Sequence, residues 1–282
     1  MDIEKLTDVV GARVTGLDLS QELDDETHST LHKAWLDHQV LVIPGQDFTQ
    51  EEQIRFARRW GEFPKRERYK KRAEKSVADK SIMLVSNIRE NGIPIGSLPD
   101  GEMMFHSDGA YAKRPFRYTL LYAIEIPSAG GNTKFANMYK AYEALPELLK
   151  DRLANAHAEQ VYYAGSVEKN KPSDSLTGKR VHPLFIAHEE TGRTALYASR
   201  LITTRIEGLP SDESDEILEQ ICEISEREEF VYEHAWTPGD LVMWDNRCTN
   251  HARTDFSPGE RRLLRRTTVF GVDPVSANAE AA

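Results

Sequence analysis

Short runs of β-branched and aromatic residues, separated by polar turns, dominate the sequence and predict strands. Each run is bounded by Gly, Pro, Asn or Asp, which favour turns and weaken strand interiors. The predicted strands cover residues 40–43, 81–86, 118–126, 194–199, 230–234, 240–244 and 265–272. The chain is therefore expected to be rich in short β-strands.

Apolar residues at helical spacing predict a smaller set of helices, one of them over residues 25–38. The residues expected to start the other helices are Thr49 (in a capping-box pattern with Glu52), Asn137, Pro146 and Ser211. Most of this helix lies outside the strand-rich stretches. The order indicates a mainly β fold with flanking helices, a barrel or sandwich rather than alternating βαβ units.

The composition fits one globular domain over residues 1–282, since 39% of the residues are hydrophobic and no repeat or linker interrupts the chain. The basic run at 65–80 and the turn-rich stretch at 165–178 are typical of solvated surface. Their functional interpretation is a pair of lid segments, near 65–104 and 165–180. A net charge of -10 disfavours nucleic-acid binding, so a small molecule is the expected partner.

Membrane and export signals are also missing from the pattern. The opening stretch MDIEKLTDVVGARV has no apolar core of signal-peptide length, and no segment approaches about 18 uninterrupted apolar residues. The chain has only two cysteines, too few for a disulfide scaffold. A cytoplasmic location without membrane contact is expected. Cys248 could ligate a metal because it lies near His251, but a buried packing role is favoured.

Three His-x-carboxylate triplets, beginning at His106, His157 and His188, could supply metal ligands. A chain with nine histidines produces such triplets by chance, so local geometry must separate them. The triplet at His157 follows a helical pattern, and residues two apart on a helix point in different directions. The triplet at His188 is predicted to form a surface hairpin turn. Both are expected to be solvated polar residues.

His106 and Asp108 lie instead in an extended pattern, where side chains two apart share a face with Cα atoms about 6.6 Å apart. His251, after the predicted strand 240–244, is the expected third ligand. Two histidines and one carboxylate on one face of an octahedron leave coordination positions open. That arrangement is typical of oxygen-activating iron(II) enzymes.

Several blocks in a fixed order resemble one known family. They are GARVTGLDLS (11–20), HQVLVIPGQ (38–46), FHSD (105–108), GGNTKFANMYKAYEAL (130–145), WDNRCTNHAR (244–253) and the arginine cluster 261–266. The sequence resembles the taurine / 2,4-dichlorophenoxyacetate dioxygenase family of iron(II)- and 2-oxoglutarate-dependent oxygenases over nearly its whole length. The departures are Pro44, Phe105 and the stretch 86–105, which does not match the family's substrate-pocket residues.

The resemblance implies a double-stranded β-helix core, of jelly-roll or cupin-like type, that uses Fe(2+), 2-oxoglutarate and O2. It implies that His106, Asp108 and His251 bind the iron. Thr133 and Arg262 match the residues that contact 2-oxoglutarate. The implied reaction releases succinate and CO2 while a substrate is hydroxylated or cleaved. A homodimer or homotetramer is expected from the same resemblance.

The arginine cluster supports an anion site on physical grounds. Arg262 and Arg266 are four apart in a predicted strand, so they share a face with Leu264. Inward guanidinium groups are costly unless anions pair with them. Arg266 also matches an arginine that holds the substrate's anionic group in several family members. A shift of one residue would transfer these roles to Arg261 or Arg265.

The substrate is expected to be a small anion, a carboxylate, sulfonate or phosphonate, bound at Arg266. Met104, Phe105 and Tyr111, with Met103, suggest an apolar or aromatic body. The retained Asp108 argues against an iron halogenase, which gives up the carboxylate to make room for chloride. Two alternatives stay open: a cupin-like zinc or manganese hydrolase or isomerase, and a non-catalytic 2-oxoglutarate-binding sensor.

Overall fold

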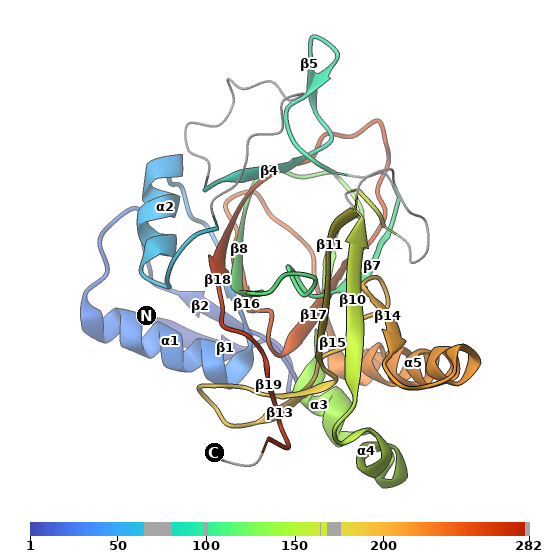
Figure 1. The fold of residues 1–282 in the computed structure, drawn as a ribbon. Helices are drawn as coiled ribbons and strands as arrows, with labels where there is room; N and C mark the ends of the chain where they lie inside the picture. Colours follow the sequence, from blue (N-terminus) through green and yellow to red (C-terminus); the bar gives the residue numbers. More distant parts are fainter. Residues whose placement is uncertain (65–80, 99–100, 164, 168–175, 280–282) are drawn as a thin grey trace.

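The computed structural model describes residues 1–282 except 65–80, 99–100, 164, 168–175 and 280–282 (Figure 1). The basic run predicted to form a lid therefore lies outside the described residues, as do residues 168–175 of the second lid segment. The described end of that second segment belongs to a strand that begins at Leu176.

Two facing sheets form the jelly-roll core. Within the described ranges, the larger sheet has the order β1-β2-β3-β16-β8-β18-β4 and the smaller one β15-β9-β17-β7. The larger sheet contains β1 (Asp2–Lys5), β2 (Ala12–Thr15), β3 (Val40–Ile43), β4 (Met83–Ser86), β8 (Phe116–Glu125), β16 (Leu241–Asp245) and β18 (Leu263–Phe270). The smaller sheet contains β7 (Met103–His106), β9 (Thr133–Asn137), β15 (Val231–His234) and β17 (Thr249–Arg253). The predicted mainly β, jelly-roll fold is confirmed.

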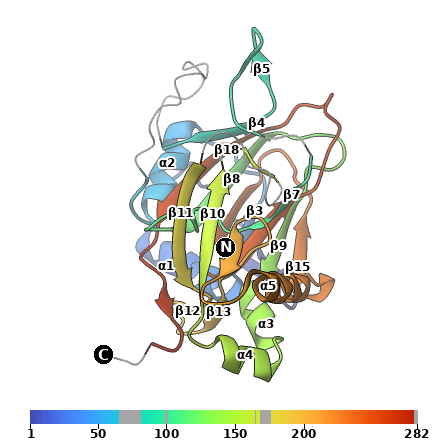
Figure 2. The same ribbon diagram turned by 45° about the vertical axis from the view of Figure 1, so that its right-hand side comes forward.

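Three smaller sheets flank this core. They are β11-β10-β14 (Leu176–Pro183, His157–Tyr163, Thr203–Ile206), β13-β12-β19 (Thr194–Leu196, Phe185–Ala187, Val275–Ser276) and the hairpin β5-β6 (Arg89–Glu90, Ile93–Pro94). The hairpin projects at the top of both views (Figures 1 and 2). The stretch that could not be matched from the sequence thus folds partly as a β-hairpin beside the core.

Helices pack on the outside. They are α1 (Asp25–His38), α2 (Gln50–Arg58), α3 (Met138–Glu143), α4 (Glu147–Leu153) and α5 (Ser211–Ser225), with a 3-10 turn η1 (Glu228–Phe230). Figures 1 and 2 show α3, α4 and α5 gathered at one end, while α1 and α2 lie beside the larger sheet. No helix in the described part of the chain is long and apolar enough to cross a membrane.

Strand β16 shows how the core divides into layers. Leu241 and Met243 pack in the cluster shared with α1 and α2, whereas Val242 and Trp244 pack in the cluster between the two sheets. Side chains alternate across a strand, so a strand buried on both faces is apolar at every position. This explains the unbroken LVMW run. The site is built on the face of β16 that carries Val242 and Trp244, between the two sheets.

The predicted helices are present, with one wrong cap, but the helical pattern expected at His157 is wrong, because His157 lies in β10. The bounds of α1 match, Thr49 and Glu52 form the capping box, and Asn137 caps α3 through Tyr139 and Lys140. The prediction that Ser211 caps α5 is wrong, because Pro210 occupies the N-cap position and Ser211 is the first helical residue. Proline fits the start of a helix because no intrahelical bond needs its missing N–H.

Candidate active site

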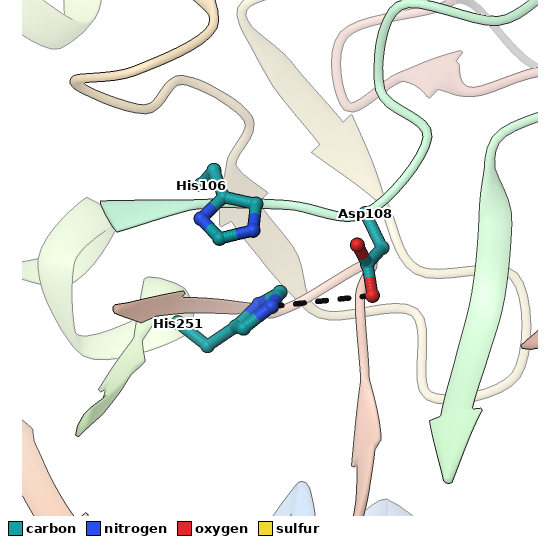
Figure 3. A group of neighbouring side chains, drawn as sticks. All are labelled: His106, Asp108 and His251. Atoms are coloured by element: carbon teal, nitrogen blue, oxygen red, sulfur yellow. Dashed lines mark ion pairs between the residues drawn. The ribbon is translucent and has the colours of Figure 1, made fainter. Parts of the chain in front are cut away.

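The three predicted ligands come together from two neighbouring strands. His106 is the last residue of β7 and pairs in register with His251 of β17, while Asp108 follows two residues after the end of β7. The two imidazole rings lie 4.1 Å apart between centroids. One potential ligand atom from each residue lies within 4.8 Å of the others, and all three residues are buried (Figure 3). The spacing suits coordination of a single ion.

Each histidine is held with a nitrogen available to a metal. His106 Nδ1 lies 2.9 Å from the carbonyl of Met104; because a carbonyl only accepts, Nδ1 carries the proton and Nε2 keeps its lone pair. His251 packs against Trp244, and its Nε2 lies 3.9 Å from the Asp108 carboxylate. Burial lowers the pKa of both histidines. At His251, the neighbouring His106 lowers the pKa further. Both rings are therefore neutral, as metal binding requires.

Asp108 is oriented by hydrogen bonds from behind. Thr119 of β8 donates to its Oδ2 at 2.8 Å, and the side-chain amide of Asn246 donates to Thr119 Oγ1 at 2.9 Å. Because the Thr119 oxygen already accepts from Asn246, its own proton is directed to the carboxylate. Asn246 Oδ1 in turn accepts from the Asp108 backbone N–H at 3.2 Å. Such supporting contacts fix ligand orientation before a metal arrives.

Arg266 contacts the same carboxylate. Its guanidinium donates to Asp108 Oδ1 at 3.1 Å and lies 3.1 Å from the sulfur of Met83. Burial alone would raise the pKa of Asp108, but the charge of Arg266, with help from the Thr119 hydrogen bond, holds it well below its usual range. The donor set is thus two neutral imidazoles and one ionised carboxylate. This set fits iron(II) with positions left open for a co-substrate and O2.

A pocket of about 900 Å³, its open mouth included, lies in front of this group. It is lined from both sheets by apolar and aromatic side chains, among them Met83, Met103, Tyr111, Leu121, Tyr162 and Ile202. The described lining residues include three arginines, Arg253, Arg262 and Arg266, and one carboxylate, Asp108. The pocket therefore combines an apolar wall with an excess of positive charge.

Arg262 and Thr133 both line this pocket. Arg262, only 1% exposed, donates to the carbonyl of Gly131 at 3.2 Å, and its Nε has no hydrogen-bond partner among the described residues. Burial, reinforced by the charge of Arg253, lowers the pKa of Arg262 to about 9. A buried guanidinium with an unused donor is a site prepared for an anion.

The neighbouring arginines point elsewhere, which settles the register. Arg265 packs on the other face of β18, its guanidinium 4.8 Å from the ring of Tyr122. Arg261 is on the surface and pairs with Glu125 at 2.7 Å. The alternatives that assigned the pocket to Arg261 or Arg265 are therefore not supported by the geometry.

Two of the residues predicted to contact substrate do not line the pocket. Met104 and Phe105 pack instead against the core cluster near α3 and α5. Phe105 faces away from His106 because adjacent side chains alternate along a strand. Met104 is displaced by a β-bulge: His251 pairs with His106 but Arg253 pairs with Met103, so β7 carries one extra residue. The bulge places Met103, rather than Met104, beside the pocket.

Tyr111 does line the pocket, and it stacks on Tyr162 of β10 with ring centroids 5.1 Å apart and planes at 20°. Gly178 lies directly opposite Tyr162 in the β10–β11 ladder. A Cβ at Gly178 would lie 2.6 Å from the Tyr111 ring, so the glycine leaves room for this ring. The stacked tyrosines form the aromatic wall of the pocket.

The rejected triplets are placed away from this pocket, although two arguments against them were wrong. His157 and Glu159 belong to strand β10, not to a helix; Glu159 pairs with Lys179 at 2.5 Å. His188 lies in a hairpin turn as predicted, but it is 1% exposed rather than solvated. A buried partner explains this, since its Nε2 lies 3.0 Å from Asp245.

His188, Asp245 and Cys248 form a second buried group of ligand-type side chains. Its chemistry argues against a metal. Arg247 occupies the Asp245 carboxylate at 2.8 Å, and burial raises the pKa of the Cys248 thiol well above its usual range. Cys248 is the buried packing residue that the sequence suggested.

Sequence reasoning missed Arg253, Thr119, Asn246 and Tyr162. Arg253 could have been found, because it lies two residues after His251 on a strand and so shares its face. Asn246 stands in the WDNR block. Thr119 and Tyr162 give no local signal, since only the tertiary fold brings them to the site.

A jelly-roll core, a buried His-Asp-His group and a nearby Thr–Arg pair together define the class of 2-oxoglutarate-dependent non-haem iron oxygenases. The chain belongs to the taurine catabolism dioxygenase TauD, TfdA family, whose model matches residues 2–268. It is a 2-oxoglutarate-dependent dioxygenase that uses Fe(II), 2-oxoglutarate and O2. This assignment decides between the oxygenase interpretation and the two alternatives considered from the sequence.

Known relatives match nearly end to end. The chain is 36% identical to pentalenolactone F synthase of Streptomyces avermitilis over 97% of its own length and 95% of the relative's. It is 34% identical to the (S)-phenoxypropionate/alpha-ketoglutarate-dioxygenase of Sphingobium herbicidovorans, with 99% and 98% covered. The crystal structure of AAD-2 in complex with Mn(II) and N-oxalylglycine matches with a TM-score of 0.82 and 30% identity, with 97% and 99% covered.

Proposed function

We propose that His106, Asp108 and His251 hold the iron and that the pocket in front of them oxidises a small organic anion. The observation that carries this proposal is the buried triad in a pocket whose described lining includes three arginines and one carboxylate. When bound, iron and 2-oxoglutarate supply O2 activation coupled to release of succinate and CO2. The protein's own contribution is positioning and charge.

Arg262 and Thr133 hold the distal carboxylate of 2-oxoglutarate in this proposal. Their side chains line one pocket, and Gly131, two residues before Thr133, is already bonded to Arg262 at 3.2 Å. A guanidinium and a hydroxyl match the two oxygens of a carboxylate. The buried charge of Arg262 is then neutralised only when the co-substrate is present.

The substrate itself is an anion with an apolar body. Three arginines and iron(II) outweigh Asp108 and the two carboxylates of 2-oxoglutarate, so the loaded pocket keeps an excess of positive charge. Arg266 and Arg253 line the pocket, and their positive charge can balance a carboxylate, sulfonate, phosphonate or sulfate. Relatives named as phenoxypropionate and sulfate ester dioxygenases support this class. The stacked Tyr111 and Tyr162 suit a flat or extended apolar group.

The outcome of oxidation depends on the carbon attacked. A hydroxyl group placed on a carbon that bears an ether oxygen or a sulfate collapses with cleavage of that bond, whereas one on an ordinary carbon is stable. The same residues therefore support hydroxylation and oxidative cleavage, and the substrate's position in the pocket decides between them.

A substrate panel tests the proposal. Aryloxyalkanoates, alkyl sulfates, alkyl sulfonates and alkyl phosphonates should be compared with neutral analogues of equal size, scored by succinate release above the uncoupled background. Anions are expected to stimulate release, and Asp108→Ala should abolish it. Equal stimulation by the neutral analogues would refute the anionic class. Succinate formation with substrate oxidation by Asp108→Ala would refute the triad.

A further inference from the structure

The indole of Trp236 is bonded to Thr133. Trp236 Nε1 donates to Thr133 Oγ1 at 3.0 Å, and the two residues are only 7% and 4% exposed. An indole N–H can only donate, so the threonine oxygen is the acceptor in this contact. The hydroxyl proton of Thr133 must then point elsewhere, and no described residue accepts it. Thr133 lines the pocket, so the proton is available to a ligand there.

We propose that Trp236 is a positioning residue for 2-oxoglutarate: by occupying the acceptor side of Thr133, it makes the threonine hydroxyl a donor to the distal carboxylate. This inference rests on the proposed role of Thr133 and Arg262. A free hydroxyl can rotate and present a lone pair to the carboxylate, which repels it. With Trp236 in place, that rotation leaves a buried indole N–H without its partner, which is costly.

Trp236 is well held for this role. Its ring packs between the two sheets with Phe135 and Trp244, and the ring of His234 meets it edge-on at 4.7 Å. His234 is fixed by Asp240 at 3.1 Å, and the same Asp240 oxygen accepts the Thr237 N–H at 2.9 Å. The turn from β15 to β16 is thus locked by its own hydrogen bonds, which leaves the indole little freedom to move.

The second donor is Arg262, which lines the same pocket and contacts Gly131, two residues before Thr133. Arg262 is tied to the Gly131 carbonyl, and its Nε is buried without a partner among the described residues. The Thr133 O–H and the Arg262 Nε–H are therefore two donors that no described residue uses. Trp236 fixes the direction of the first, and the Gly131 carbonyl fixes the second. A preorganised pair binds a carboxylate with less loss of entropy than two free side chains.

Trp236→Phe tests the role because it keeps an aromatic ring and removes only the N–H end. The measurement is the dissociation constant of 2-oxoglutarate by calorimetry, with Mn(II) loaded and without substrate. We expect it to rise roughly 5–20-fold, part of the value of one hydrogen bond to a charged group, because the Thr133 hydroxyl remains but is no longer held as a donor. Mn(II) affinity should not change.

A double-mutant cycle separates positioning from general packing damage. Adding Trp236→Phe to Thr133→Val should cause no further loss of 2-oxoglutarate affinity, since the hydroxyl to be oriented is already gone. Trp60→Phe, another buried tryptophan that lies in the cluster with α1 and α2, serves as the matched control. If Trp236→Phe does not fold, a tryptophan isostere with sulfur in place of the indole N–H replaces it.

The outcomes that overturn the idea are distinct. An unchanged dissociation constant in Trp236→Phe, while Thr133→Val weakens binding, refutes the positioning role alone. Equal losses in both backgrounds of the cycle do the same, because they show a packing effect. Unchanged binding in Thr133→Val and in Arg262→Met would instead refute the proposed 2-oxoglutarate site.

Discussion

Arg262→Met should stabilise the protein without ligands and nearly abolish its affinity for 2-oxoglutarate. Arg262 is 1% exposed, and no described carboxylate pairs with it. Burial and Arg253 lower its pKa from 12.5 to about 9. The lowered pKa means that folding penalises the charged form. The penalty is present in full below pH 9 and disappears as the pH rises towards 12.5.

The size of the two effects follows from the structure. The pKa shift corresponds to a penalty on the order of 5 kcal/mol, from which about 1 kcal/mol is subtracted for the Gly131 carbonyl that loses its donor. A net gain of up to about 4 kcal/mol raises the unfolding midpoint by up to about 8 °C for a domain of this size. Losing two charge-assisted hydrogen bonds weakens 2-oxoglutarate binding at least about 100-fold.

The assay pairs thermal unfolding at neutral pH with calorimetric titration of 2-oxoglutarate onto the Mn(II)-loaded protein. Arg265→Met is the matched control, because Arg265 is also buried and lies in β18, three residues after Arg262, but faces away from the pocket. It should leave 2-oxoglutarate affinity unchanged. A lower midpoint in Arg262→Met, with affinity retained, would show that Arg262 is an ordinary structural arginine and refute the reasoning.

Three further predictions concern the ligands and the wall of the pocket. Thr119→Val removes the hydroxyl that orients Asp108 and should raise the Mn(II) dissociation constant about 10-fold, measured by titration; unchanged affinity would contradict this. Because burial lowers the pKa of both triad histidines, metal affinity should stay nearly constant from about pH 8 to 6.5 and fall only at lower pH. A tenfold loss of metal affinity between about pH 8 and 6.5 would contradict this prediction. Gly178→Ala forces a Cβ to 2.6 Å from the Tyr111 ring and should lower kcat/KM about 10-fold for the bulkiest accepted substrate. The 2-oxoglutarate affinity of Gly178→Ala should not change. Gly259→Ala, whose Cβ would meet nothing closer than 3.9 Å, should leave both kcat/KM and 2-oxoglutarate affinity unchanged.

The parts of the fold that follow from local pattern were predictable. Strand β3 and helix α1 were predicted with their observed bounds, because continuous apolar runs and capping residues are encoded in adjacent positions. Strand β10 was predicted as helix, since His157 follows the helical pattern of α4 and only pairing with β11 and β14 reveals the strand. Pairing between distant segments is not a local property.

The site residues also divide into those that local spacing predicts and those that depend on pairing between distant segments. His106 and Asp108 could be placed because their spacing in an extended chain decides which face they share. Met104 could not, because the bulge in β7 depends on how the strand pairs with β17. The contact of Arg266 with Asp108 was also missed. This contact links Arg266, which was predicted to bind substrate, to the metal ligand Asp108. No spacing in the sequence indicates it.

The binding of both iron and 2-oxoglutarate in this pocket is the central claim, and anaerobic spectroscopy tests it most directly. Adding 2-oxoglutarate to the Fe(II)-loaded protein should produce a weak, saturable visible charge-transfer band, which is absent when either component is omitted or when Zn(II) replaces Fe(II). Arg262→Met should need at least about 100-fold more 2-oxoglutarate to reach half of that band. A protein that binds both components by calorimetry but shows no band would contradict the account.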